Sequence, residues 1–229
     1  MPHAPRPVQE PSTLAAAELE RARAVAKDSN IQGEKVTLRP KRLDDAPRDY
    51  AWRCDEEMAR YDGVPPLRIS LQDFLNTHAE ELRYPSPHRQ VYAIEDGQGR
   101  HIGNIMYYDL DLARGEAELG IAIGDRGYWG RGYGTDAVIT FVRHLFTRMP
   151  LRRIFLNTLD WNVRAQRAFA KAGFTACGRV FRNGNTFITM ELHPERLQEQ
   201  APPDGQDRHG GSEANGQGQR PLSSASGGS

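Results

Sequence analysis

Hydrophobic and polar residues alternate along short segments of this chain, the pattern of β-strands with one buried face. The alternation is clearest in residues 116–124, where one face carries Ala117, Leu119, Ile121 and Ile123 and the other carries Glu116, Glu118, Gly120 and Ala122. Six more strands are predicted at residues 35–40, 90–94, 101–110, 152–159, 176–181 and 186–192. Turn residues at Asp96–Gly97 and Asn183–Gly184 join two pairs of these strands as hairpins.

Apolar residues at helical spacing predict four helices between the strands. Two of them, residues 45–60 and 70–83, separate the first strand from the first hairpin, and Ser70 with Asp73 resembles a capping box. The third follows the glycine-rich residues 127–134, and the fourth runs from a cap at Asp160 or Asn162 to a stop at Gly173. The order of elements predicts a mixed α/β fold of about seven strands and four helices.

The two ends of the chain differ in composition from its middle. Residues 194–229 are rich in Gly, Pro, Gln and Ser, which predicts a disordered tail. Residues 1–33 include a helix-forming stretch with few apolar side chains, which either docks or forms a solvated arm. One folded domain is therefore expected over residues 34–193.

Charge and cysteine content narrow the classes of function. The 30 basic and 30 acidic side chains cancel, so net charge favours neither nucleic acid nor an anionic membrane as a partner. Only two cysteines are present, and the seven histidines show no metal-ligand spacing, so no metal is expected. Without a signal peptide or an apolar run long enough to span a membrane, a soluble cytoplasmic protein is predicted, as a monomer or a homodimer.

Four glycines, Gly127, Gly130, Gly132 and Gly134, precede the third helix. A helix N-terminus presents unpaired N–H groups and a partial positive charge, and glycines let a ligand approach the backbone, so the segment predicts a phosphate site. Arg126 and Arg131 favour this interpretation, whereas Asp136 in the first turn opposes it, since a carboxylate there can itself satisfy the helix end. The alternative is a tight turn that binds no ligand.

Two familiar phosphate-binding motifs compare poorly with this segment. A Walker loop requires Lys after the glycine, but Tyr133 follows Gly132. A dinucleotide-binding fold agrees with G-x-G-x-x-A at Gly132, Gly134 and Ala137 and with Asp160 after the next strand. Its glycines should follow the strand directly, however, and the chain has hairpins where that fold needs further βαβ units.

The segment "YWGRGYGTDA" instead resembles the GNAT superfamily of acyl-CoA-dependent N-acyltransferases, most closely the branch of ribosomal-protein N-terminal and polyamine acetyltransferases. Gly132 and Gly134 match the small positions of the family's loop motif, while Trp129 stands where Gln or Arg is usual. A second segment, "NVRAQRAFAKAGF", is similar to the family's motif after the fifth strand. The resemblance covers residues 34–192.

The resemblance implies a sheet whose strands at residues 116–124 and 152–159 splay apart at one end. It implies that the pantetheine arm of acetyl-CoA lies in that gap and contacts the backbone of Ile121 and Ile123, with Asn162 also holding the cofactor or merely capping its helix. The diphosphate is then expected on the loop and first helical turn, at Trp129, Gly130, Arg131, Gly132, Tyr133, Gly134 and Thr135.

The implied reaction is attack by a neutral amine on the thioester, which requires a base because amines of pKa near 10 are mostly protonated at neutral pH. Glu118 lies where several family members carry this base; the alternative is a solvated strand face shared with Glu116. Phe169 and Ala165 occupy the usual positions of the acid that protonates the thiolate, and neither can donate a proton.

The acceptor amine is left open between a protein N-terminus, a polyamine and another small amine. The acids Asp55, Glu56, Glu57 and Asp62 would suit a cationic amine or form an ordinary solvated helix face. A non-catalytic acyl-CoA-binding module and a dinucleotide-dependent oxidoreductase are the competing classes of function.

Overall fold

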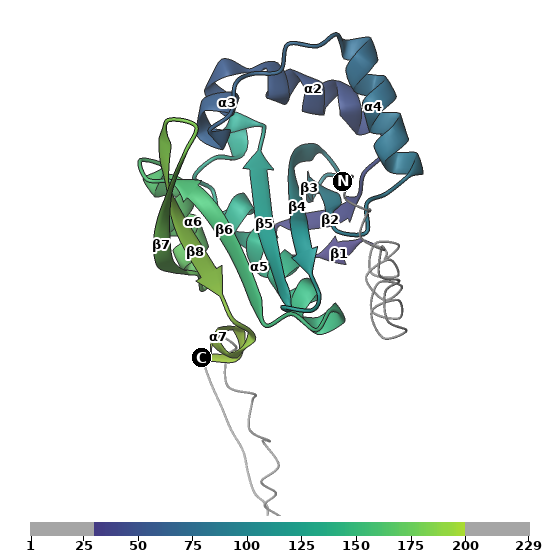
Figure 1. Ribbon diagram of the computed structural model, residues 1–229. Coiled ribbons are helices and arrows are strands. Elements are labelled where there is room, and N and C mark those ends of the chain that lie inside the picture. The colour runs from purple at the N-terminus through teal and green to yellow at the C-terminus, as the bar shows by residue number, and fades with distance from the viewer. Residues whose placement is uncertain (1–29, 200–229) are drawn as a thin grey trace, which may run out of the picture.

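A twisted sheet of eight strands forms the centre of the molecule, with helices packed around it (Figure 1). The computed structural model describes residues 30–199. The strand order is β1-β2-β3-β4-β5-β6-β8-β7. The strands are β1 Ile31–Gln32, β2 Val36–Pro40, β3 Gln90–Asp96, β4 His101–Asp111, β5 Glu116–Ile123, β6 Arg153–Leu159, β7 Thr175–Arg182 and β8 Asn185–Leu192. All neighbours are antiparallel except β5 and β6, which confirms the mixed sheet.

The helices form two groups around the sheet. One face is covered by α5 Tyr133–Arg148 and α6 Val163–Lys171. The helices α2 Ala46–Cys54, α3 Glu56–Asp62 and α4 Leu71–Arg83 arch over the upper end of the sheet (Figure 1). Short 3₁₀ turns, η1 Leu43–Asp45 and η2 Arg126–Tyr128, precede α2 and α5. The core lies between the sheet and α5, where Phe141 contacts Tyr92 and Tyr107.

Three predicted boundaries differ from the structure. The predicted helix 45–60 is broken at Asp55, because the extended Asp55 accepts a hydrogen bond from Met58 N and caps α3 as a separate helix. Residues Ile31–Gln32, assigned to the N-terminal arm, pair with β2 as β1. The predicted disordered tail begins too early, because α7 Pro194–Glu199 is helical and places Leu197 against the core.

Other local predictions are confirmed. Ser70 caps α4 by accepting a hydrogen bond from Asp73 N, and Asn162 caps α6 through Ala165 N. Asn183 and Gly184 both have positive φ, 51° and 76°, as a two-residue hairpin turn requires. The helix-forming stretch at residues 12–28 lies outside the described part of the chain, and no helix within residues 30–199 is both long and apolar enough to cross a membrane.

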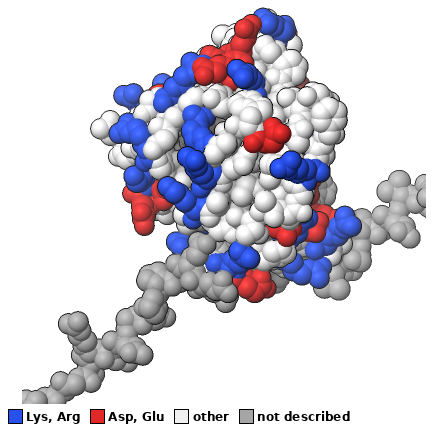
Figure 2. Space-filling view, turned by 90° about the vertical axis from the view of Figure 1, so that its left-hand side faces the viewer, with Lys and Arg blue, Asp and Glu red and all other residues white. Residues whose placement is uncertain are grey.

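The charges are unevenly spread despite the neutral sum. On the face seen from the side of β7 and α6, Lys and Arg side chains run down the surface, and most acidic clusters lie toward its upper and lower ends (Figure 2). Net charge therefore says little about the electrostatic character of any one site.

Candidate active site

The β5–β6 pair opens into a wedge part-way along its length. The two strands pair only at Glu116–Arg153, Ala117–Ile154 and Glu118–Phe155, although β5 continues to Ile123 and β6 to Leu159. Beyond Glu118 each strand therefore presents a backbone edge to the gap. The splay that the family resemblance implied is confirmed, and Glu118 stands at its vertex.

The backbone of β5 turns alternate residues toward this wedge. Gly124 N donates to Ile102 O of β4 at 2.9 Å, and an ideal Cβ on Gly103 of β4 would lie 2.3 Å from Ala122 O. Even-numbered residues thus direct their N–H and C=O groups at β4, so Ile121 and Ile123 direct theirs into the wedge. Ile123 O already accepts a hydrogen bond from Trp129 Nε1 at 2.6 Å, whereas Ile121 remains available to an incoming strand-like ligand.

The glycine-rich loop has the backbone that an anion site at a helix start requires. Gly130 and Gly132 have φ of 70° and 88°, a region that favours glycine, and Gly132 is the N-cap residue of α5. The helical hydrogen bonds of α5 begin with the one from Asp136 N to Gly132 O, which is 3.0 Å long. The N–H groups of Tyr133, Gly134 and Thr135 precede it and point out of the helix end.

Asp136 does not satisfy the end of its own helix, and that objection to a phosphate site was wrong. Its carboxylate accepts hydrogen bonds from the backbone of the β1–β2 turn, at 3.2 Å from Glu34 N, 2.8 Å from Lys35 N and 3.1 Å from Val36 N. The first turn of α5 is therefore left without a side-chain cap.

The cations around the loop are not the ones that the sequence indicated. Arg126 is engaged by Asp55 and Glu57, each at 2.8 Å, and Arg131 Nη1 donates to Gly127 O at 3.1 Å. The cation next to the loop is Lys35. Its Nζ donates to Arg131 O at 3.1 Å and lies 3.5 Å from the position that a Cβ atom on Gly132 would occupy. Nothing in the sequence links Lys35 to a loop almost a hundred residues away.

Trp129 serves as a structural anchor of the loop. The indole Nε1 of Trp129 donates to Ile123 O. The backbone N–H of Trp129 donates to Arg126 O at 3.1 Å, so this backbone amide is not free for a phosphate. Arg164 of α6 lies 3.7 Å over the Trp129 ring, and Tyr61 of α3 contacts both Trp129 and Trp161 at 5.3 Å between ring centroids. This aromatic cluster connects the β5 side of the wedge with the β6 side.

Glu118 is buried, with 6% of its surface exposed, so the alternative of a solvated strand face is wrong. Tyr108 Oη donates to Glu118 Oε1 at 2.8 Å, and Asn157 Nδ2 donates to the same oxygen at 2.9 Å. Thr189 Oγ1 in turn donates to Asn157 Oδ1 at 2.8 Å, which fixes the orientation of the amide. Both donors hold Oε1, which leaves Oε2 to accept a further proton.

Tyr108 stays a phenol in this environment. Burial first, and then the hydrogen bond to the Glu118 carboxylate, raise the pKa of Tyr108 well above its usual range. The side chain therefore donates to Glu118 at every physiological pH. Sequence reasoning missed Tyr108, Asn157 and Thr189 because they come from three other strands, β4, β6 and β8, and no motif joins them.

The remaining predicted site residues lie on α6. Asn162 Oδ1 accepts from Ala165 N at 3.2 Å, so its side chain serves as the helix cap in the structure. Phe169 is buried against Phe174, with 6.0 Å between ring centroids. Neither Phe169 nor Ala165 supplies an acid for the leaving thiolate. Among residues 30–199, no group of His, Cys, Asp or Glu side chains has the arrangement of a metal site.

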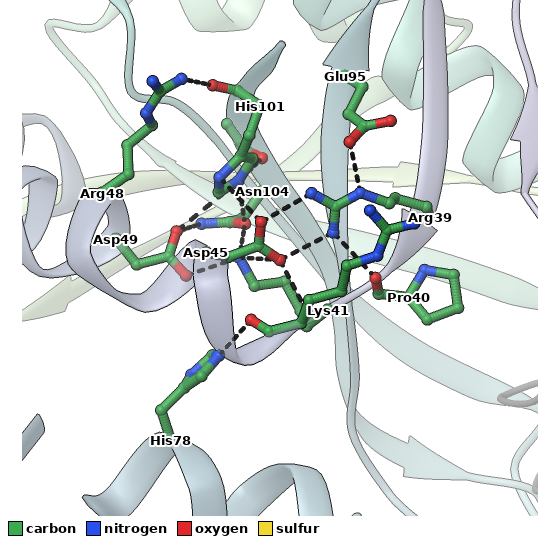
Figure 3. Close-up of polar contacts among 12 residues, drawn as sticks. Arg39, Pro40, Lys41, Asp45, Arg48, Asp49, His78, Glu95, His101 and Asn104 are labelled. Carbon is green, nitrogen blue, oxygen red and sulfur yellow. Dashed lines mark hydrogen bonds and ion pairs between the residues drawn. The ribbon is translucent and has the colours of Figure 1, made fainter. Parts of the chain in front are cut away.

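A groove of about 1230 Å³ lies on the Glu118 face of the sheet, under α2 and α4. One wall is a buried polar network that fixes α2 to the sheet (Figure 3). Arg39 forms two hydrogen bonds with Asp45, at 2.8 and 2.7 Å, while Lys41 contacts Asp49 at 2.6 Å and Asn104 at 2.8 Å. These contacts fix α2, which borders the groove, in place above β3 and β4.

A splayed pair of strands, a glycine-led helix and a buried carboxylate at the vertex are the features that the resemblance to the GNAT superfamily of acyl-CoA-dependent acyltransferases implied. The chain belongs to the family described as acetyltransferase (GNAT) domain, whose sequence profile matches residues 35–175. It is therefore an N-acetyltransferase, and the alternatives of a dinucleotide-dependent oxidoreductase and a non-catalytic module are not supported. A single parallel pair is also too few for a dinucleotide fold.

The chain is also similar to curated relatives in sequence and to solved structures in fold. The chain is 29% identical over 134 residues to a spermine/spermidine N(1)-acetyltransferase of Bacillus subtilis, covering 56% of this chain and 82% of the relative. A spermidine N-acetyltransferase from Vibrio cholerae, solved with CoA and spermine, shares 19% identity with a TM-score of 0.64, over 72% of this chain and 98% of that one. An aminoglycoside acetyltransferase in complex with coenzyme A shares 21%, with a TM-score of 0.60 over 72% and 98% of the two chains.

Proposed function

We propose that the protein transfers the acetyl group of acetyl-CoA to a primary amine by direct attack on the thioester, with Glu118 as the general base. The observation that carries the proposal is the position of Glu118 at the vertex of the wedge, with Oε1 held by two donors. The Bacillus subtilis relative and the Vibrio cholerae structure are polyamine N-acetyltransferases, the third protein is an aminoglycoside acetyltransferase, and both solved structures were obtained with CoA.

The bound thioester reaches Glu118 along the wedge. The open edge of β5 at Ile121 matches an amide-containing arm, and the N–H groups of Tyr133, Gly134 and Thr135 face its diphosphate. Gly130, Arg131 and Gly132 form the loop beside it, and Lys35 adds a positive charge. The thioester carbonyl is then placed near Glu118, at the closed end of the gap.

The chemistry requires two protons to leave the nitrogen of an acceptor that arrives as an ammonium group. Glu118 Oε2 removes the first, and the freed amine attacks the carbonyl carbon. The C–S bond then breaks to release CoA thiolate, and the nitrogen loses its second proton to solvent, which leaves a neutral amide. Tyr108 and Asn157 keep the carboxylate oriented during the transfer. A thiolate with an ordinary pKa near 8.5 takes its proton from solvent, so no side-chain acid is required.

The test is steady-state release of CoA with a panel of primary amines and the variant Glu118→Gln. We expect kcat to fall by about 10²- to 10⁴-fold while the calorimetric Kd of acetyl-CoA stays unchanged. Glu116→Gln is the matched control, because Glu116 lies on the same strand and face but pairs with Arg153 at 3.4 Å. Full turnover in Glu118→Gln would show that the base is another group.

A further inference from the structure

The groove under α2 and α4 lies on the face of the sheet that carries Glu118. Met106 of β4 lines the groove, and its partner across the sheet is Gly120, two residues from Glu118 on the same face of β5. A Cβ placed on Gly120 would lie 3.2 Å from Met106 Cγ and 3.1 Å from Tyr108 Cε1. Tyr108 follows Met106 on the same face of β4 and donates a hydrogen bond to Glu118, so the groove comes within one side chain of the proposed base.

More positively than negatively charged side chains line this groove. Its two carboxylates are already matched, because Asp49 lies 2.6 Å from Lys41 and Glu81 lies 3.4 Å from Arg89. Two guanidinium groups are left, those of Arg53 and Arg83.

Within residues 30–199, neither Arg53 nor Arg83 has a carboxylate within 4.0 Å. Arg53 feels the charge of Asp62 only at longer range, and Arg83 lies 5.3 Å from the centre of the Tyr84 ring. The groove therefore carries an excess of positive charge on the approach to Glu118.

Most of the acidic residues that the sequence suggested as a site for a cationic amine already contact arginine side chains. Asp55 and Glu57 bind Arg126, and Asp55 also caps α3. Glu56 lies 3.4 Å from Arg68. Of the four, only Asp62 makes no such contact with a cation, and it faces Arg53. A polycation would therefore meet one acid and two arginines.

We propose that the acceptor carries an anionic group, a carboxylate in the simplest case, at the end remote from its amine, and that Arg53 and Arg83 bind this group. The proposal rests on the proposed function, since it names the class of acceptor for the same site. A groove of about 1230 Å³ exceeds the usual size of a small-ligand pocket, so it accommodates a short acidic peptide as well as a small amino acid. The shared chemistry is an amine at one end and a negative charge at the other.

The experiment compares acceptors that differ only in the charge of the remote end. The small pair is 5-aminopentanoate and 1,5-diaminopentane, and the peptide pair is Ala-Ala-Glu-Glu-amide and Ala-Ala-Arg-Arg-amide. We expect the wild type to favour the acidic member by about tenfold in kcat/KM, as two exposed arginines without a carboxylate partner allow. The pair with the larger preference identifies the source, a small amino acid or a peptide.

Charge reversal at the two arginines assigns the effect to this groove. Arg53→Glu and Arg83→Glu should each lower the preference by about tenfold, mainly through KM. Arg114→Glu is the control, because Arg114 is equally exposed but lies in the β4–β5 turn, outside the groove. Calorimetric binding of CoA with wild-type affinity shows that each variant is folded.

Two results separate the proposals. A wild-type preference for the diamine and for the arginine peptide, or the same preference in all three variants, overturns the anionic acceptor and leaves the acetyltransferase intact. Tight binding of acetyl-CoA without transfer to any of the four amines instead contradicts the proposed function, and the acceptor assignment with it.

Discussion

Asp45 is the residue on which the attachment of α2 to the sheet depends most. Burial opposes its ionisation, but hydrogen bonds from Arg39 and from Arg42 N, together with the charge of Lys41, outweigh this cost and hold the pKa of Asp45 well below its usual range. His101 lies on the same network, 3.5 Å from Asp45 Oδ1, and burial lowers the pKa of its imidazole. The network therefore stabilises the folded state most when Asp45 is charged.

Asp45→Ala should lower the free energy of unfolding at pH 7 by about 3 to 5 kcal/mol, because it leaves the buried Arg39 without a main partner. The folded pKa of Asp45 is depressed below its ordinary value of 3.8, so the wild-type advantage is complete above about pH 5 and is lost progressively as the pH falls through that value toward the folded pKa. Urea unfolding at pH 7 and pH 3 measures both effects. Asp44→Ala, an exposed neighbour, should change little at either pH, and a gap between wild type and Asp45→Ala that does not narrow at pH 3 would contradict this account.

The sequence could predict Glu118, but it could not predict the residues that form hydrogen bonds with Glu118. Glu118 was predicted from the family resemblance, because its place in the strand and its distance from the glycine loop are those at which several family members carry their base, and both lie in one continuous segment. Tyr108 and Asn157 hold Glu118 Oε1, but they meet it through the pairing of β4 with β5 and of β5 with β6. Such partners depend on strand register, which the chain's own pattern does not reveal.

At the scale of an element, the start of α5 combines two glycines with different requirements. Gly132 has φ of 88°, whereas Gly134 already lies in the helix, and a Cβ on it would contact Ile123 Cγ1 at 3.5 Å. A methyl group at residue 134 would thus point into the space between α5 and β5. Residue 132 therefore needs glycine for its backbone, whereas the backbone of residue 134 does not require glycine.

Gly134→Ala should therefore leave the melting temperature unchanged or slightly raised, since Ala favours a helix over Gly by about 1 kcal/mol. The same variant should weaken CoA binding, because its methyl group narrows the wedge at Ile123. Gly132→Ala should lower stability by about 1 to 2 kcal/mol through strain at positive φ. Thermal unfolding and calorimetry with CoA measure the two properties separately, and wild-type affinity in Gly134→Ala would place the ligand elsewhere.

The elements themselves were largely readable from the sequence, and their exceptions have local causes. Turn residues and caps such as Asn183–Gly184 and Ser70 act within a few residues, so their effects are visible in sequence. The break at Asp55 looked like a continuous helix because Asp is tolerated within helices as well as at their caps. The wedge was predicted from the family resemblance alone, since no periodicity marks where two parallel strands stop pairing.

At the scale of the whole molecule, the wedge is a gap in an otherwise continuous hydrogen-bonded sheet. Its edge amides should behave differently from those on the other side of β5. We expect the N–H groups of Ile121 and Ile123 to exchange rapidly with solvent deuterium in the free protein, and at least one of them to slow by about tenfold or more when CoA is bound. Gly120 and Ala122, which face β4, are the internal control and should be protected in both states. Amide exchange followed by NMR resolves the four positions, and equal exchange of all four would contradict a ligand in the gap.

The single parallel pair of strands also explains why the two halves of the cofactor site lie together. Parallel neighbours cannot be joined by a tight turn, so the chain must leave the carboxyl end of β5, cross over one face of the sheet as α5 and return to start β6 at the opposite end. That crossover necessarily begins beside the place where β5 runs free of β6. One change of direction in the chain's path thus produces both the slot for the arm and the positive helix end for the phosphates, and any insertion or deletion in residues 124–132 would displace both together.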